Sequence, residues 1–289
     1  MTAVRTAVVL THGHPEGLRD GLASAIAAAE RVGVELYADS DELGKHEVEA
    51  VGGIRNATQL AGDPDLCLAL GGDGTILKGL RRFAGTPVPV FGINYGTVGF
   101  LAAVESAALE RGLEAAFAHD FEVIELPALE VSLPDAGTGD LRAGLNDISF
   151  TRRPHHRVAE LSYRLGGREV GHVRCDGLVA ATPVGSTGYN LANGGPILAW
   201  GVEGYVVSFI APHTLTSRPL VVAPDDVLHV RNDGTIDSVD VAIDGVPAGE
   251  LEPDSDLEIR FRDGRGRLAQ LEGGTFYNRI REKFGRLTQ

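Results

Sequence analysis

One short stretch limits what this chain can fold into more than any other. Residues 66–70 read LCLAL, residues 71–75 read GGDGT, and residues 76–83 read ILKGLRRF. A run that is apolar at every position is typical of a parallel strand covered on both faces, whereas the apolar spacing after the turn is typical of a helix. Strand, glycine turn and helix N-terminus together present bare N–H groups and the positive end of a helix dipole. The stretch therefore predicts a phosphate-binding turn.

The carboxylate in this turn needs its own explanation, because a phosphate site normally avoids negative charge. Asp73 has two interpretations. It takes part in chemistry, as a base or through a metal ion, or it is the N-cap of the helix in an ordinary tight turn between a strand and a helix. The five residues of the turn do not decide between these interpretations.

The first 120 residues alternate between strand-like and helix-like patterns. Apolar runs predict strands at Ala3–Leu10, Glu35–Tyr37, Leu66–Leu70 and Pro87–Ile93, and periodic apolar spacing predicts helices from Pro15 to about Gly33, over Ile76–Phe83 and over Ser106–His119. Alternation of this kind indicates an α/β fold. We therefore expect residues 1–120 to form an α/β domain with a Rossmann-like parallel sheet that carries the GGDGT turn.

From about Phe121 the pattern changes to short β-rich runs separated by Gly, Pro and Asp. These runs are 123–133, 145–151, 158–165, 168–173, 177–182, 205–210, 227–230, 239–243 and 257–261, and residues 165–168 (LGGR) predict a hairpin turn. The pattern predicts an all-β, sandwich-like domain over residues 121–272. A last helical pattern, Phe276–Phe284, predicts a C-terminal helix within residues 273–289, which we expect to pack on the N-terminal domain. Because no linker separates the domains, we expect close packing, with the active site in the interdomain crevice.

Composition excludes several classes of function. The formal net charge of the 289 residues is −14, which argues against non-specific binding of nucleic acid, although a local nest of N–H groups can still bind a nucleotide. No apolar run approaches the ~20 residues of a membrane helix, and the N-terminus resembles a first strand more than a signal sequence. We therefore expect a cytoplasmic protein with no membrane and no nucleic acid among its partners.

The cysteines and histidines do not form a metal-site pattern. Cys67 and Cys175 lie in apolar, strand-like segments, so we interpret both as buried core residues without a disulfide. Histidines such as His12 and His14 lack carboxylate or cysteine partners at separations that suit a metal ion. No direct protein ligand of a metal is therefore predicted.

Polar, glycine-rich strings recur between the predicted elements. After GGDGT come residues 94–101 (NYGTVGFL), 146–147 (ND), 176–190 (DGLVAATPVGSTGYN), 212–220 (PHTLTSRPL) and 243–245 (IDG). Ligands of open parallel sheets bind at the carboxyl ends of the strands, so we expect the GGDGT and NYGTVGFL loops to face one pocket. The chain has neither the GxxxxGK(S/T) loop of P-loop enzymes nor a GxGxxG turn after its first strand.

In this order, the strings resemble the NAD kinase family over about residues 66–245. GGDGT by itself is shared with lipid kinases and phosphofructokinases, but the whole series is specific. The resemblance implies Mg²⁺-dependent transfer of the γ-phosphoryl group of ATP to the 2′-hydroxyl of the adenosine ribose of NAD, giving NADP and ADP. It implies that Asp73 is the general base that takes the hydroxyl proton, and that Mg²⁺, the cofactor, neutralises phosphate charge.

The resemblance also assigns binding residues and an assembly. It implies that ATP phosphates bind at Gly71, Gly72, Gly74 and Thr75, and that NAD binds at Gly74, Phe100, Asn146, Asp147, Arg174, Asp176, Thr187, Gly188, Tyr189 and Asp244. In the family, Asn146 and Asp147 hold the adenosine and Asp176 contacts the nicotinamide end. The segment 187–189 lines the adenine and ribose pocket and can come from a neighbouring subunit, which implies a homodimer or homotetramer. Plain turns stay an alternative for the Asn146 pair and for Asp244.

Three positions bear on activity and specificity. The family usually has Thr or Ser at position 184 and Ala at position 188, where this chain has Val184 and Gly188. Val184 removes a hydroxyl that could bind substrate or orient the loop, whereas Gly188 leaves more room and more flexibility. In the family, a basic residue at the position of Arg174 goes with a preference for NAD⁺ over NADH. An exposed arginine at the end of a strand is the alternative interpretation of Arg174.

Two other functions are compatible with parts of the pattern. A lipid kinase of the diacylglycerol or sphingosine type shares GGDGT and the two-domain plan, but such kinases have a GTGN-type string where this chain has NYGTVGF. A non-catalytic dinucleotide sensor would keep the pocket without turnover. The intact Asp73 argues against a sensor, because a binding protein gains nothing from an unneutralised carboxylate beside phosphate.

Overall fold

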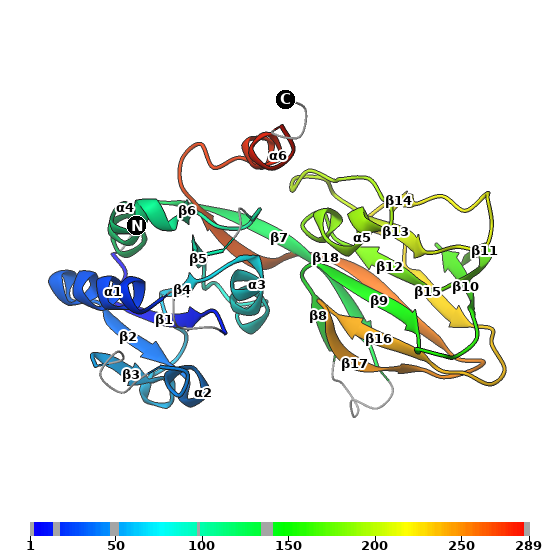
Figure 1. Ribbon diagram of the computed structural model, residues 1–289, viewed down its shortest axis with the longest axis horizontal. Coiled ribbons are helices and arrows are strands. Elements are labelled where there is room, and N and C mark those ends of the chain that lie inside the picture. Colours follow the sequence, from blue (N-terminus) through cyan, green and yellow to red (C-terminus); the bar gives the residue numbers. More distant parts are fainter. Residues whose placement is uncertain (1–2, 14–17, 47–51, 97–98, 134–140, 286–289) are drawn as a thin grey trace. The chain divides into compact units, whose positions relative to one another are not determined.

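The computed structural model describes residues 3–13, 18–46, 52–96, 99–133 and 141–285 (Figure 1). The chain divides into two compact units, one of residues 1–125 with 266–289 and the other of residues 126–265. It passes from the first unit to the second within strand β7 (Glu122–Ser132) and returns within strand β18 (Asp256–Gln270). Each unit has its own core, and each carries part of the polar strings described above.

The first unit is built on a parallel sheet, as the alternating pattern predicted. Its strand order is β18-β5-β4-β1-β2-β3, and β6 pairs with β5. The strands are β1 (Thr6–Thr11), β2 (Glu35–Ala38), β3 (Ile54–Asn56), β4 (Leu66–Leu70), β5 (Val90–Asn94) and β6 (Val104–Glu105). Every residue of β4 is buried, because β4 is central and helices cover both of its faces.

Helices cover the two faces of this sheet. The helices of this unit are α1 (Arg19–Val32), α2 (Ser40–Leu43), α3 (Asp73–Arg82), α4 (Leu109–Ala118) and α6 (Phe276–Phe284), with 3-10 turns at Ala57–Gln59 and Ser106–Ala108. Helices α1 and α4 pack beside each other on the face that carries Leu66 and Leu68 (Figure 1). Helix α3 covers the opposite face, where Gly79 approaches Cys67 so closely that a Cβ would lie 3.1 Å from its sulfur. The predicted start of the first helix, Pro15, lies outside the described residues.

The second unit is a sandwich of two antiparallel sheets. One has the order β14-β13-β12-β9-β16-β17, and the other contains β11-β10-β15-β18, with β7 pairing with β18 and β8. The strands are β8 (Leu141–Gly144), β9 (Asp147–Arg152), β10 (Ala159–Leu165), β11 (Arg168–Cys175), β12 (Gly177–Ala181), β13 (Tyr205–Ile210), β14 (Leu220–Val222), β15 (Leu228–Asn232), β16 (Val239–Ile243) and β17 (Val246–Leu251). Large apolar side chains of both sheets, among them Phe150, Tyr205 and Ile259, share one core.

Two local predictions are confirmed in these units. Gly166 and Gly167 have φ values of +54° and +78°, which is the geometry of a two-residue hairpin turn between β10 and β11. Cys67 and Cys175 are fully buried and free, and burial raises the pKa of their thiols to about 12 and about 11. Among the described helices, none is both long and apolar enough to cross a membrane.

Candidate functional site

The GGDGT turn holds its carboxylate in a way that only the folded chain reveals. Gly72 is the N-cap of α3, and Asp73 is the first helical residue. The Asp73 side chain does not cap the helix: Oδ2 accepts the N–H of Phe100 at 2.8 Å and Oδ1 accepts the N–H of Leu101 at 3.0 Å. The N-cap interpretation of Asp73 is therefore wrong. Because each carboxylate oxygen can accept a further hydrogen bond, the side chain is fixed but not saturated.

The glycines around Asp73 have two different roles. A Cβ on Gly99 would lie 2.1 Å from Oδ1 of Asp73, and a Cβ on Gly71 would lie 2.3 Å from Oγ1 of Thr75. These two glycines make room for neighbouring side chains. A Cβ on Gly72 or Gly74 would meet no atom within 4 Å. Their lack of a side chain keeps space open in front of the helix N-terminus.

A cavity of about 370 Å³ lies at this turn. It is lined by His12, Gly71, Gly72, Asp73, Tyr95, Gly96, Gly99 and Lys283. The two loops that line it are joined by hydrogen bonds, from Gly71 N–H to the Ile93 carbonyl at 3.0 Å and from Tyr95 N–H to the Gly71 carbonyl at 3.3 Å. The expectation that the GGDGT and NYGTVGFL loops share a pocket is confirmed for the residues described.

Not every residue assigned to phosphate or to NAD in this unit faces the cavity. Gly74 is exposed beside it, and Thr75 is buried with its hydroxyl against Gly71. The Phe100 side chain is 4% exposed, so Phe100 contributes its backbone N–H to Asp73 rather than a ring surface. Two lining residues, His12 and Lys283, were missed. His12 directly follows β1, and β1 lies beside β4 in the sheet, so the sheet order explains why His12 reaches the cavity. No sequence motif near Lys283 indicated that it would line the cavity.

The open space at Gly72 gives a direct test of phosphate binding. Its backbone, at φ −89° and ψ −171°, is one that alanine adopts without strain. We expect Gly72→Ala to fold normally and to raise the KM for ATP at least ~10-fold, because the new methyl group occupies the space that a phosphate needs. Steady-state kinetics checks this. Gly201→Ala, which also meets no atom within 4 Å but lies in the second unit, should leave the KM unchanged.

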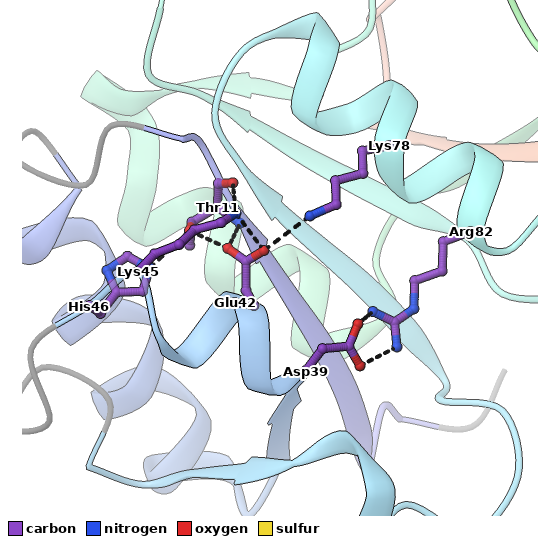
Figure 2. Close-up of polar contacts among 7 residues, drawn as sticks. All are labelled: Thr11, Asp39, Glu42, Lys45, His46, Lys78 and Arg82. Carbon is purple, nitrogen blue, oxygen red and sulfur yellow. Dashed lines mark hydrogen bonds and ion pairs between the residues drawn. The ribbon is translucent and has the colours of Figure 1, made fainter. Parts of the chain in front are cut away.

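A buried charge network fixes the end of β1 beside this cavity (Figure 2). Glu42 in α2 is 3% exposed, and its Oε1 accepts both the N–H, at 2.7 Å, and the hydroxyl of Thr11. Its Oε2 pairs with Lys45 at 2.7 Å and with Lys78 of α3 at 3.3 Å. Two ammonium groups, one from the turn after α2 and one from α3, thus meet one carboxylate. Thr11 precedes the cavity residue His12, so Glu42 ties α2 and α3 to the strand end that forms part of the cavity.

The second unit gathers several of the residues assigned to NAD. Asp244 and Gly245 have φ values of +50° and +74° and form the turn between β16 and β17. The Asp244 carboxylate accepts the N–H groups of Leu145, Asn146 and Asp147 at 3.0, 2.7 and 3.1 Å. Asp244 is therefore a turn residue whose carboxylate holds the Asn146–Asp147 segment in place. A turn at Asp244 is thus compatible with a binding role for Asn146 and Asp147.

Asn146 and Asp147 together offer a buried hydrogen-bond acceptor and a carboxyl group with a raised pKa. The Oδ1 atom of Asn146 is buried and has no hydrogen-bond partner among the described residues. Burial and the nearby Asp244 carboxylate raise the pKa of Asp147 to about 7. A buried acceptor without a donor is costly in a folded protein, so it points to a ligand that supplies N–H or O–H groups.

The segment 185–189 packs directly on this pair. A Cβ on Gly185 would lie 2.0 Å from the Asn146 carbonyl oxygen, so only glycine fits there. The Thr187 hydroxyl donates to the Val184 carbonyl at 3.1 Å, and the Tyr189 side chain is 40% exposed. The pKa of Tyr189 is raised by burial and by the negative charges of Asp147 and Asp176. The structure thus brings Asn146, Asp147, Asp244 and the 185–189 segment together.

The two departures from the family pattern are accommodated locally. Val184 is buried, and the turn that it occupies is closed by the Thr182 hydroxyl, which accepts the Gly185 N–H at 3.1 Å. A hydroxyl at position 184 is therefore not required to orient this loop. A Cβ on Gly188 would lie 3.3 Å from the Gly185 carbonyl oxygen, so glycine here relieves a tight contact.

Asp176 and Arg174 lie at the other end of β12 from this cluster. Asp176 pairs with Arg152 at 2.5 Å, and the hydrogen bond from Arg152 lowers the pKa of Asp176. Arg174 is 62% exposed and lies 3.3 Å from Glu160, its cross-strand neighbour on β10. The ion pair between Arg174 and Glu160 is exposed, so the guanidinium can readily exchange Glu160 for another anion.

The residues that the structure describes form no preformed metal cage in either unit. Among the described residues there is no group of three or more His, Cys, Asp or Glu side chains that could hold a metal ion. A Mg²⁺ ion that arrives with a nucleotide needs no such cage, because phosphates and waters supply most of its ligands. The free acceptor positions of Asp73 in the cavity fit this mode of binding.

Comparison with known protein families gives two matches that together span most of the chain. Residues 37–121 match the ATP-NAD kinase N-terminal domain, and residues 145–270 match the ATP-NAD kinase C-terminal domain. An NAD kinase of Lachnoclostridium phytofermentans is 30% identical over 241 residues, which cover 81% of this chain and 85% of that protein. An NAD kinase of Gemmatimonas aurantiaca is 34% identical over 224 residues, covering 76% and 77%.

Solved structures with the same fold include relatives with bound nucleotides. An NAD kinase from Archaeoglobus fulgidus in complex with ATP has a TM-score of 0.71 and 28% identity, covering 98% of both chains. Yeast NADH kinase complexed with NADH has a TM-score of 0.86 over 100% of this chain and 90% of its own. At 20% identity, the second likeness shows the fold alone.

Proposed function

Because the chain belongs to the NAD kinase family, we propose that it transfers the γ-phosphoryl group of ATP to the 2′-hydroxyl of the adenosine ribose of NAD, giving NADP and ADP. The observation that carries this proposal is the carboxylate of Asp73, held by two backbone N–H groups in a cavity at a helix N-terminus. A helix N-terminus with open glycines suits the phosphates of the donor.

Asp73 acts as the general base in this proposal. The ribose hydroxyl is a poor nucleophile, so a positioned carboxylate accepts its proton as the new P–O bond forms and the bond to ADP breaks. The N–H groups of Phe100 and Leu101 fix the carboxylate orientation, which leaves a lone pair free on each oxygen for the hydroxyl. Mg²⁺, carried by the ATP phosphates, supplies neutralisation of the charge on the transferred group.

The acceptor dinucleotide binds through residues of the second unit. Asn146 and Asp147 offer a buried amide oxygen and a carboxyl group to the hydroxyls of the ribose and the edge of the adenine. Tyr189, Thr187 and Gly188 form the adjoining wall of this adenosine site, and Asp176 contacts the nicotinamide end. Asp244 positions the Asn146–Asp147 segment through its three backbone hydrogen bonds.

One assay tests the function. The protein is incubated with ATP, Mg²⁺ and NAD⁺, and NADP is detected through an added NADP-specific dehydrogenase. Absence of NADP would sink the proposal. Parallel reactions with diacylglycerol or sphingosine in mixed micelles, read out by transfer of labelled phosphate, test the lipid kinase alternative.

We propose that Arg174 gives this enzyme a preference for NAD⁺ over NADH. Its exposed guanidinium exchanges Glu160 for a group of the oxidised dinucleotide or its surroundings. We expect Arg174→Gly to bring the ratio of kcat/KM for NAD⁺ to that for NADH at least ~5-fold closer to one, since a lost charge-assisted contact is worth about 1 kcal/mol or more. Arg168→Gly, an exposed arginine on the same strand, is the control and should leave the ratio unchanged. An unchanged ratio in both variants would leave Arg174 as a surface ion pair only.

We propose a homodimer or homotetramer in which a neighbouring subunit completes the NAD site. Exposed apolar side chains of the second unit, among them Tyr189, Ile197, Leu220 and Val221, support this, because apolar surface of this kind is often covered in an assembly. Light scattering coupled to size-exclusion chromatography tests it, and a strictly monomeric active enzyme would contradict it.

The two free, buried cysteines support a reducing, cytoplasmic location, which fractionation of cells would test.

A further inference from the structure

The C-terminal helix brings a positive charge to the phosphate cavity. Lys283 lies near the end of α6 and lines the cavity together with Gly71, Gly72 and Asp73. Among the described lining residues, Lys283 has the one side chain with a permanent positive charge. Glycines, the Asp73 carboxylate, His12 and Tyr95 form the rest of the described wall. A site for a polyanion that contains a carboxylate of its own needs a cation to balance it.

Helix α6 is fixed to the loop that holds Asp73. The Phe100 ring stacks on Phe276, with ring centres 6.4 Å apart, and lies 6.1 Å from the ring of Phe284. The buried Arg279 donates to the carbonyl of Ala102 and lies 3.5 Å from that of Ala103. Both contacts are made with the loop whose N–H groups hold Asp73, so the position of α6 and that of the catalytic carboxylate are determined together.

The end of strand β18, which leads into the C-terminal segment, reinforces this attachment. Gln270, at the end of β18, donates from Nε2 to the Leu101 carbonyl at 2.8 Å. Leu101 in turn donates its N–H to Asp73. The C-terminal segment thus contacts four successive residues of this loop, 100–103, and a side chain on α6 is held at a defined place relative to Asp73.

The ammonium group of Lys283 is held near the cavity by an aromatic ring. Its Nζ lies 4.3 Å from the centre of the Phe100 ring, and no carboxylate of the described residues forms an ion pair with it. A cation over an aromatic face is attracted less strongly than a cation that donates to a phosphate oxygen. The ring therefore keeps the ammonium in place until a phosphate arrives.

We propose that Lys283 binds the phosphates of the donor nucleoside triphosphate and so acts as a catalytic residue supplied by the C-terminal helix. This inference rests on the proposed function for the identity of the donor. In the bound state the ammonium donates to phosphate oxygens in front of Gly71 and Gly72, and it stabilises the negative charge that moves onto ADP as the phosphoryl group leaves.

The test compares two lysine variants with a neighbouring arginine. Lys283→Met keeps an apolar chain on the Phe100 ring but removes the charge, and Lys283→Arg keeps the charge. Arg281→Met removes a positive charge from an exposed position of the same helix. Equilibrium titration with Mg·ATP gives the Kd of each folded protein, and the melting temperature verifies folding, which an exposed side chain should not disturb.

We expect Lys283→Met to raise the Kd for Mg·ATP about 10-fold or more, as loss of a charge-assisted hydrogen bond requires. Lys283→Arg should stay within a few-fold of wild type, and Arg281→Met should not change the Kd. The KM for NAD⁺ should be the same in all three variants. An unchanged Kd for Lys283→Met, or an equal loss in Arg281→Met, would overturn the inference. Because the titration needs no turnover, a wild type that binds Mg·ATP but forms no NADP would contradict the proposed function and not the role of Lys283.

Discussion

Replacing Asp73 with asparagine should lower kcat at least ~100-fold, because a positioned general base typically contributes a factor of 10² to 10⁴. Asparagine is nearly the same size as aspartate but cannot accept the proton of the ribose hydroxyl. The Kd values for Mg·ATP and NAD⁺ should change only a few-fold, since the glycines and the helix N-terminus that bind phosphate are unaltered. Steady-state kinetics together with equilibrium titration of both ligands gives this comparison.

The hydrogen bonds of Asp73 require a control for indirect effects. An asparagine amide placed toward the N–H of Phe100 or Leu101 would disturb the loop as well as remove the base. Gly99→Ala provides the separate measurement, because its Cβ would meet Oδ1 of Asp73 at 2.1 Å and displace a carboxylate that is chemically intact. Both variants should lose kcat. If Asp73→Asn retained near-wild-type turnover, Asp73 would be a structural residue and the mechanism proposed above would be wrong.

Glu42→Gln should destabilise the first unit by about 3 kcal/mol at pH 8, the lower end of the range for breaking a buried ion pair. The glutamine amide cannot pair with Lys45 and Lys78, so two ammonium groups lose the carboxylate that both contact (Figure 2). A loss of this size lowers the melting temperature by roughly 6–12 °C for a unit of this length. Urea unfolding followed by circular dichroism measures it.

The pH dependence of this loss has a defined sign. Burial acts to raise the pKa of Glu42, but the hydrogen bonds from Lys45 and Thr11 outweigh it, so that the pKa lies below its ordinary value of 4.5. A carboxyl group with a lowered pKa stabilises the fold above its ordinary pKa, and this stabilisation is lost as the pH falls through the lowered value. The difference between wild type and Glu42→Gln should therefore persist from pH 8 to pH 5 and shrink at more acidic pH.

The neighbouring groups and a second ion pair provide the controls for this experiment. His46 contacts the Thr11 hydroxyl, and burial lowers its pKa, so it is neutral at pH 8 and adds no third positive charge to the network. Asp39 and Arg82 form a partly exposed pair in the same view (Figure 2). Asp39→Asn should cost less than ~1 kcal/mol, as exposed pairs do. Equal losses for Asp39→Asn and Glu42→Gln would show that burial of Glu42 is not what makes its network important.

The parts of the fold that were predicted from the sequence are those where burial requires apolar residues at regular positions along the chain. Strand β4 is apolar at every position because both of its faces are covered, and α1 and α4 show one apolar stripe because one face of each is covered. The elements that were missed, among them α2, β3, β14 and β17, are short or largely exposed. An exposed edge strand needs no apolar alternation, since backbone hydrogen bonds to one neighbour are enough to hold it.

The beginning of α3 shows a second kind of limit. Apolar spacing predicts this helix from Ile76, but it begins at Asp73, because Gly72 serves as the N-cap and leaves the GGDGT residues Asp73 to Thr75 inside the first turn. Helical periodicity cannot mark these residues, which carry chemistry instead of a buried stripe. Strand β18 likewise continues beyond the predicted run 257–261 to Gln270. Charged residues interrupt its later part, so an apolar pattern does not predict it.

For the candidate site, the sequence by itself determined which residue types meet phosphate and dinucleotide: a glycine turn between a buried strand and a helix, followed in order by the strings that mark the family. Local propensity and motif order suffice for that, because they depend on neighbours along the chain. Only the tertiary structure decided that the Asp73 carboxylate is held by Phe100 and Leu101, that Asp244 holds the Asn146–Asp147 segment, and that Lys283 reaches the phosphate cavity from the C-terminal helix. These contacts join residues tens to hundreds of positions apart, and packing of whole elements, which leaves no periodic trace in the sequence, is what brings them together.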